Sequence, residues 1–250
     1  AGGLVGINAG TITSCHATSA VTGNDHVGGL VGGTSGGTIT LCYATGAVRG
    51  NDHVGGLVGG GVLGGTITSC YATGTVTGVG IDKYYVGGLI GENYGGSVRT
   101  SYATGAATGE KYVGGLVGSN SSSIPITSCY STGTVTGNDF VGGLAGYDNN
   151  TIKVTPSYWD MNTSGLSTSD VGEGRTTAEM TYPYATNTYV GWNFVTVWVE
   201  DTDESINNGY PYLLGNVPPT KDTVVKPQFS PVPGTYTTTQ NVTITCATSD

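Results

Sequence analysis

The hexapeptide VGGLVG occupies Val27–Gly32 and again Val54–Gly59, and variants of it recur along the first 150 residues. The other copies are AGGLVG from Ala1, VGGLIG from Val86, VGGLVG from Val113 and VGGLAG from Val141. Steps of 26, 27, 32, 27 and 28 residues separate the first glycines of the copies, which are Gly2, Gly28, Gly55, Gly87, Gly114 and Gly142. A period in this range is typical of a solenoid, in which each turn buries its apolar face against the next.

A second block, rich in Thr, Ile, Val and Tyr, follows each glycine block. It reads TITSCHATS from Thr11, TITLCYATG from Thr38, TITSCYATG from Thr66, SVRTSYATG from Ser97, PITSCYSTG from Pro125 and VTPSYWD from Val154. β-Branched and aromatic residues favour strands, and the glycines between them suit tight corners. We therefore predict an all-β fold, a parallel β-solenoid (β-helix) of about six coils of 26–32 residues. Each coil should hold three short strands, such as Gly56–Val58, Thr66–Tyr71 and Thr75–Thr77.

Equivalent residues of successive coils should stack into ladders. The leucines of the glycine block are predicted to line the interior: Leu4, Leu30, Leu57, Leu89, Leu116 and Leu144. An aromatic line, whose direction the sequence leaves open, should cover one corner: His16, Tyr43, Tyr71, Tyr102, Tyr130 and Tyr158. Four cysteines share one repeat position, at which Ser101 and Ser157 stand in other coils: Cys15, Cys42, Cys70 and Cys129. This exchange favours packed, reduced thiols, and a disulfide between neighbouring coils is the alternative.

Composition excludes several classes of function. The 250 residues carry a net charge of −9, and the eight lysines and arginines are scattered. Nucleic-acid surfaces need clustered cations, so that class is excluded. No apolar run approaches the roughly 20 residues of a membrane helix, and no membrane span is predicted. Without a CxxC pair or a calcium-binding nonapeptide, we predict no metal and no cofactor. An acidic, lysine-poor chain rich in Thr and Gly is typical of secreted bacterial surface proteins, which predicts an extracellular or cell-surface location.

One motif could form a metal site or an acid–base pair. Asn24-Asp25-His26 and Asn51-Asp52-His53 occupy equivalent places, and Asn138-Asp139-Phe140 lacks the histidine. Asn-Asp is ordinary turn chemistry, which favours a corner loop over a weak metal site. A glycan-cleaving β-helix needs paired carboxylates or a carboxylate-bound calcium beside a basic residue, and the sequence shows no such arrangement. We therefore do not expect this chain to be an enzyme.

The third step of the repeat is longer than the others because of an insertion. The inserted sequence is VGIDKYY at Val79–Tyr85. Loops that project from a solenoid often carry recognition. Its last four residues are therefore a candidate recognition loop: Asp82, Lys83, Tyr84 and Tyr85.

Two known families resemble parts of this chain. GGLVG followed by CYATG resembles the GLUG repeat of large bacterial surface and secreted proteins, over about residues 1–155. SYWD at 157–160, TTAEM at 176–180, GWNF at 191–194 and NNGYPYL at 207–213 resemble the segment that closes such arrays, which implies an aromatic-rich cap over residues 156–217. Residues 218–250 begin with a Pro-rich linker. The following FSPVPGTYTTTQNVTITCATSD resembles the first strands of the chitobiase/β-hexosaminidase C-terminal-like β-sandwich, of which only an incomplete set is present.

These observations favour a non-catalytic structural or adhesive segment, a stalk or adhesin, of a large exported bacterial surface protein. Its partner would be a glycan or a host-surface ligand. The alternative is a self-assembling extracellular fibre subunit, joined to further copies of itself by edge-strand pairing or strand donation. A glycan-active β-helix enzyme is a distant third.

Overall fold

The computed structural model describes residues 1–79, 84–149, 156–219, 228–230 and 243–245. The chain divides into two compact units, Ala1–Val217 and Pro218–Asp250. In the second unit, β30 (Gln228–Ser230) pairs antiparallel with β31 (Thr243–Thr245). Among the described residues, no helix is long and apolar enough to cross a membrane.

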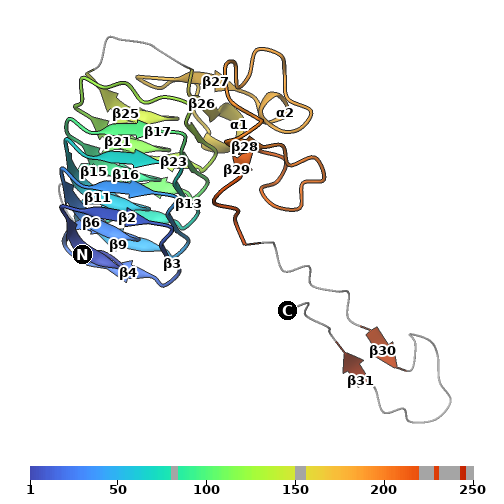
Figure 1. The fold of residues 1–250 in the computed structure, drawn as a ribbon, viewed down its shortest axis with the longest axis horizontal. Coiled ribbons are helices and arrows are strands. Elements are labelled where there is room, and N and C mark those ends of the chain that lie inside the picture. The colour runs from blue at the N-terminus through green and yellow to red at the C-terminus, as the bar shows by residue number, and fades with distance from the viewer. Residues whose placement is uncertain (80–83, 150–155, 220–227, 231–242, 246–250) are drawn as a thin grey trace. The chain divides into compact units, whose positions relative to one another are not determined.

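The first unit is a stack of coils whose strands form five parallel sheets, numbered I to V in the order in which the chain visits them (Figure 1). Sheet I contains β1 (Val5–Asn8), β6 (Val31–Ser35), β11 (Val58–Leu63), β16 (Ile90–Asn93), β21 (Val117–Asn120) and β25 (Ala145–Asp148). Sheet II contains β2 (Thr11–Thr13), β7 (Thr38–Thr40), β12 (Thr66–Thr68) and β17 (Ser97–Arg99). Sheet III contains β3 (His16–Ala17), β8 (Tyr43–Ala44), β13 (Tyr71–Ala72), β18 (Tyr102–Ala103), β22 (Tyr130–Ser131), β26 (Tyr158–Asp160) and β27 (Glu173–Arg175). Sheet IV contains β4 (Val21–Thr22), β9 (Val48–Gly50), β14 (Val76–Gly78), β19 (Ala107–Thr108) and β23 (Val135–Thr136). Sheet V contains β5 (Asp25–Gly28), β10 (Asp52–Gly55), β15 (Tyr84–Gly87), β20 (Lys111–Gly114) and β24 (Asp139–Gly142).

Pairing within these sheets joins equivalent residues of the repeat. In sheet III, Tyr71 pairs with Tyr43 on one side and Tyr102 on the other. The predicted all-β parallel solenoid is therefore confirmed.

Two details of the coil differ from the prediction. The sheets show five short strands per coil rather than three. The predicted strand Thr66–Tyr71 is interrupted at Ser69, whose φ of 53° turns the chain. In place of the predicted strand Gly56–Val58, two strands, β10 (Asp52–Gly55) and β11, flank a bend at Gly56. The solenoid has about five full turns, since the last copy of the repeat contributes β25 and β26 before the chain enters helix α1 (Met161–Ser164).

The paired glycines of the repeat stand where neighbouring strands approach too closely for a side chain. A Cβ atom on Gly55 would lie 2.0 Å from the carbonyl oxygen of Val58. One on Gly56 would lie 2.0 Å from the carbonyl oxygen of Gly88 in the next coil. Because any larger residue would force the backbone apart, the glycine pair fixes the corner between sheets V and I.

The interior is filled by apolar ladders. Five of the predicted leucines are fully buried: Leu30, Leu57, Leu89, Leu116 and Leu144. The prediction for Leu4 is wrong, since 49% of this residue is exposed. Leu4 belongs to the first coil of the sequence and bonds to Leu30 on one side only, so no second coil buries it.

The four cysteines of the repeat are free, and three of them are fully buried. The backbone amide of Cys42 donates to the sulfur of Cys70 at 3.4 Å, and the amide of Cys70 donates to the hydroxyl of Ser101 at 3.1 Å. A cysteine sulfur and a serine hydroxyl therefore accept the same hydrogen bond from the backbone amide of the neighbouring coil, which explains why cysteine and serine exchange at this repeat position. Cys246 lies outside the described residues.

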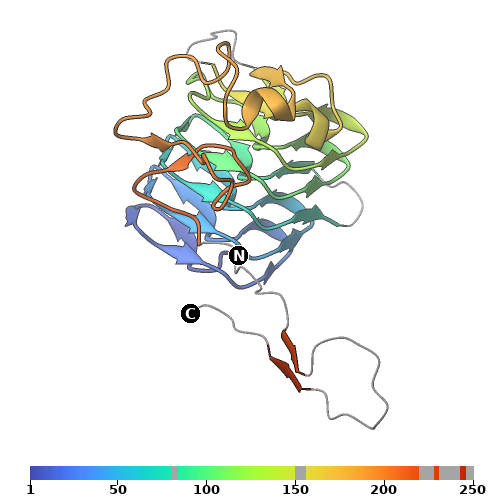
Figure 2. The same cartoon turned by 90° about the vertical axis from the view of Figure 1, so that its right-hand side faces the viewer.

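The chain then forms a cap, which we define as residues 156–217 and which includes β26. Asp160 begins helix α1 by accepting hydrogen bonds from the amides of Asn162 and Thr163, at 2.8 and 3.1 Å. Helix α2 (Thr177–Met180) begins with a capping box. Strand β28 (Trp198–Val199) pairs antiparallel with β29 (Tyr212–Leu213). Figure 2 shows the orange part of this segment in front of the coils.

Candidate functional site

The sheet III tyrosines occupy one register position in successive coils, and we call them the covered ladder: Tyr43, Tyr71, Tyr102, Tyr130 and Tyr158. The first four rings follow one another at centroid distances of 4.8, 5.0 and 4.9 Å. Tyr43 is half-buried and the other four are fully buried. The structure thus settles the direction that the sequence left open, because the rings point outward from the coils and beneath the cap.

Aromatic and amide side chains of the cap hold it on this ladder. The Trp198 ring lies 5.8 Å from the ring of Tyr130. The Asn207 side-chain amide donates to the Tyr130 hydroxyl at 2.6 Å, and this hydroxyl donates to the carbonyl of Pro211 at 2.7 Å. The Asn216 side chain donates to two backbone carbonyls of earlier coils, each at 3.1 Å. The cap is therefore bonded to several coils along the solenoid.

A second aromatic stack stands at the corner where sheet V begins, and none of the described aromatic residues of the cap contacts it. We call it the open ladder: His26, His53, Tyr85, Tyr112 and Phe140. Its successive ring centroids are 4.4, 4.7, 5.1 and 4.8 Å apart. The two end members are exposed, and the three between them are half-buried. This ladder therefore presents a line of rings to the outside of the coil.

All five members of the open ladder have left-handed backbone conformations. Their φ angles lie between 50° and 57°. This region is disfavoured for large side chains, and backbone strain of this kind is often found at functional sites. The corner between sheets II and III turns by a similar device without aromatic side chains, at residues such as Leu41, Ser69 and Ser128. An aromatic residue is thus not needed to make the turn. The turn alone does not explain why all five positions of the open ladder hold an aromatic or imidazole ring.

The predicted recognition loop leads into this ladder. Tyr84 and Tyr85 begin strand β15, and Tyr85 is the middle ring of the stack. Asp82 and Lys83 lie outside the described residues. Two of the four predicted residues are therefore placed on the same surface as the aromatic rings of four other coils.

Further side chains flank the ladder at its Phe140 end. The ammonium nitrogen of Lys111 lies 5.7, 5.2 and 5.5 Å from the ring centroids of Tyr84, Tyr112 and Phe140. Cations at this distance are attracted to aromatic rings. The ring of Tyr147 meets Phe140 edge-on, with an interplanar angle of 90°. Together with the ladder, these side chains form a surface that we call the aromatic strip.

Carboxylates enclose His53 on two sides. Its Nδ1 lies 3.1 Å from Oδ2 of Asp52, and its Nε2 lies 3.1 Å from Oε2 of Glu92 in the next coil. Burial disfavours the imidazolium, but the two carboxylates outweigh burial and raise the pKa of His53 to about 9. Burial, followed by the charge of His53, lowers the pKa of the stacked His26. A protonated ring therefore stacks on a neutral one at neutral pH.

The Asn-Asp-His motif does not lie in a corner loop as predicted. Asp25 and Asp52 begin strands β5 and β10, and the histidine after each belongs to the open ladder. The strand continues through the motif because the left-handed histidine redirects it without a separate loop. In the part of the chain that the structure describes, no group of three or more potential ligands is arranged to hold a metal ion.

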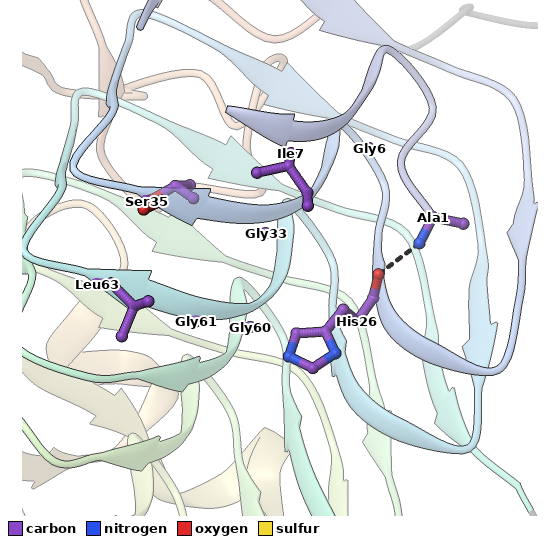
Figure 3. A pocket seen from close by; sticks show the side chains of 10 residues that line it. Ala1, Gly6, Ile7, His26, Gly33, Ser35, Gly60, Gly61 and Leu63 are labelled. Carbon is purple, nitrogen blue, oxygen red and sulfur yellow. Dashed lines mark hydrogen bonds between the residues drawn. The ribbon is translucent and has the colours of Figure 1, made fainter. Parts of the chain in front are cut away.

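A hollow adjoins the His26 end of the strip (Figure 3). Its volume is about 460 Å³, and Ile7, His26 and Leu63 stand around it. Gly33 and Gly60 line it where Glu92 occupies the equivalent position of a later coil. A Cβ atom on Gly60 would lie 2.8 Å from Cβ of His53, so a side chain at this position would displace the His53 ring.

The sequence analysis missed most of the aromatic strip, although a signal for it is present. An aromatic or imidazole residue stands directly before each Val-Gly-Gly of the described ladder, giving HVGG twice, YVGG twice and FVGG once. The predicted ladders were based on the glycines and leucines that follow this position and did not include it. Glu92 and Tyr147 carry no such pattern, because the register position that they share holds isoleucine, glycine or serine in the other coils.

Comparisons with known proteins agree with this architecture. The model of the GLUG motif matches residues 23–49, 50–77, 83–108 and 109–136. A crystal structure described as that of "a putative immunoglobulin A1 protease from Bacteroides ovatus" is similar over 86% of this chain and 74% of its own, with a TM-score of 0.59 and 22% identity. At this identity the likeness shows a shared fold. No curated protein matches the chain.

Proposed function

We propose that this chain is a non-catalytic adhesive and structural segment of a large exported bacterial surface protein, and that the aromatic strip is its binding surface. The solenoid would act as a spacer that presents the strip outside the cell. GLUG repeats occur over four stretches of the chain, in agreement with an extracellular repeat protein.

The observation that carries this proposal is the exposure of the open ladder. Half of Phe140 is exposed, although a buried aromatic side chain is worth several kcal/mol to a fold. The chain covers the tyrosine ladder with its own cap and leaves the second ladder uncovered in the described structure. Exposed aromatic groups that gather in one place typically mark interaction sites.

The environment of His53 supports the non-catalytic part of the proposal. Both of its ring nitrogens face carboxylates at 3.1 Å, and the ring is protonated at neutral pH. An imidazolium held in this way offers no lone pair to act as a general base or as a metal ligand. Protease activity belongs to the name of the Bacteroides ovatus protein, and at 22% identity we do not transfer it to this chain.

A surface-binding assay tests the proposal. The whole chain is applied to surfaces coated with mucin, with extracellular-matrix proteins or with bacterial cell-wall polysaccharide, and the retained protein is measured. We expect retention on at least one surface, and we expect Tyr85→Ala and Tyr112→Ala to reduce it. The matched control is Tyr94→Ala, because Tyr94 is 58% exposed and has no ring contact among the described residues. Retention that is absent on every surface, or equal in all variants, would refute the adhesive role.

We further propose that residues 218–250 are the first strands of a small β-sandwich of the chitobiase/β-hexosaminidase C-terminal type. The antiparallel pair of β30 and β31 supports this reading, because such a sandwich begins with antiparallel strands. Two strands bury too little apolar area to be stable alone. Hydrogen exchange should therefore show fast exchange at β30 and β31 in this chain, and slow exchange at these strands would contradict the proposal.

A further inference from the structure

We infer that the aromatic strip binds a neutral, extended β-linked polysaccharide that lies along the solenoid axis, with about one sugar at each rung. This inference rests on the adhesive function proposed above and names its ligand. Three independent features of the strip support it: the part of each ring that faces outward, the charges beside the ladder, and the spacing of the rungs.

Stacking decides which part of each ring a ligand can meet. His26 and His53 are stacked at an interplanar angle of 6°, and Tyr85 and Tyr112 at 10°. Neighbouring rings thus cover one another's faces and leave mainly their edges outward. The edge is the positive part of the aromatic quadrupole, so it attracts oxygen atoms. The tyrosine hydroxyls on these edges can both donate and accept hydrogen bonds. A ligand rich in hydroxyl and ether oxygens meets these requirements.

The charges beside the ladder select among oxygen-rich ligands. Carboxylates on the ladder strands and their neighbours are Asp25, Asp52, Glu92, Glu110 and Asp139. The cations are Lys111 and protonated His53, and two of the carboxylates already engage His53. Because acidic groups outnumber basic ones, a polysaccharide with uronate or sulfate groups would be repelled. Carboxylates accept hydrogen bonds from sugar hydroxyls, so a neutral polysaccharide is favoured.

The spacing of the rungs favours a polymer over a single sugar. The open ladder presents five rings in line, at intervals of 4.4 to 5.1 Å. A sugar in an extended β-linked chain, such as cellulose or chitin, advances by close to one such interval. Successive sugars could then meet the rings of successive coils, and alternate sugars would present the same groups to the strip.

Titration calorimetry with cello-oligosaccharides and chito-oligosaccharides of two to six sugars tests this inference. We expect a Kd on the order of 1 mM or tighter for the longest members of at least one series. Affinity should rise with length and level off at about five sugars, because the ladder has five rungs. Tyr112→Ala should weaken binding by about tenfold or more, and Tyr112→Phe by less, because the ring remains. Tyr94→Ala should bind as the parent chain does.

Other results would overturn the inference. Oligogalacturonate that binds as tightly as the neutral series would show that charge selection is absent. Affinity that does not depend on length would contradict alignment with the rungs. If no oligosaccharide binds while the strip variants still lose retention on protein-coated surfaces, the polysaccharide inference fails and the adhesive function stands. Oligosaccharides that bind and are cleaved, as shown by new reducing ends, would instead refute the non-catalytic proposal.

Discussion

The covered ladder and the open ladder have the same internal geometry and different surroundings. Rings in both follow one another at about the distance between rungs, with centroid separations of 4.8 to 5.0 Å in one and 4.4 to 5.1 Å in the other. The cap buries four of the five covered rings completely, whereas the ends of the open ladder are exposed. Stacking therefore follows from the repeat alone, and burial depends on what packs against the stack. Only the covered ladder can contribute a full hydrophobic term to stability, which leaves the open ladder available to a ligand.

The largest expected effect contrasts Tyr102→Ala with Tyr112→Ala. Tyr102 is fully buried beneath the cap, so its loss should lower the free energy of unfolding by about 3–5 kcal/mol. Tyr112 is half-buried, and its loss should cost about 1 kcal/mol, the value of its ring contacts. Urea denaturation followed by far-UV circular dichroism measures both. Equal losses would show that the ladders do not differ in the proposed way.

A second prediction concerns the attachment of the cap. Asn207→Ala removes the amide that donates to the buried Tyr130 hydroxyl, and Asn216→Ala removes two hydrogen bonds to carbonyls of the coils. We expect each change to destabilise the protein by about 1–3 kcal/mol, because each removes two hydrogen bonds, at a net value of about 0.5–1.5 kcal/mol for each bond. Hydrogen exchange should become faster at β28 and β29 before it does so in the coils. Uniform acceleration over the whole first unit would mean that the cap and the solenoid unfold together.

The pH dependence of stability tests the carboxylate clamp around His53. The folded pKa of about 9 exceeds the unfolded value of about 6.5, so the stabilising term is complete below pH 6.5 and disappears as the pH rises through 9. Partial exposure of the carboxylates screens the pair, and we expect about 1 kcal/mol in total. The thermal midpoints of the parent chain and of His53→Gln should therefore differ at pH 6 and converge near pH 9.5. A constant difference across this range would contradict the clamp.

The smallest expected effect comes from two hydroxyls of the covered ladder. The hydroxyl oxygens of Tyr71 and Tyr102 are buried and have no hydrogen-bond partner among the described residues. Tyr71→Phe and Tyr102→Phe should therefore leave stability unchanged or raise it by up to about 1 kcal/mol. Tyr130→Phe is the matched control, because its hydroxyl bonds to Asn207 and Pro211, and it should destabilise. A loss of stability in the first two variants would indicate a water molecule or another partner at these hydroxyls.

Much of the fold could be predicted from the sequence because the chain repeats. The glycine period indicated parallel coils, and Leu57 and Leu89 lie in the interior as expected. The number of strands per coil was harder to predict, since left-handed turns at residues such as Ser69 have no sequence signature comparable to glycine. The recognition prediction named Tyr84 and Tyr85 from the insertion, and it missed Tyr112 and Phe140, which belong to coils without one.

The sequence by itself determined the period of this protein, the corners at which only glycine fits, and the residues that share a ladder. These properties follow from local backbone geometry and from pairing with the next coil. Both can be predicted from the sequence because equivalent residues recur at a constant interval. Only the tertiary structure decided which aromatic ladder is covered and which is open. That choice depends on contacts such as the bond between Asn207 and Tyr130, which are 77 residues apart and follow no period. Burial beneath the cap is a property of the assembled chain, because it requires both surfaces to be present at once.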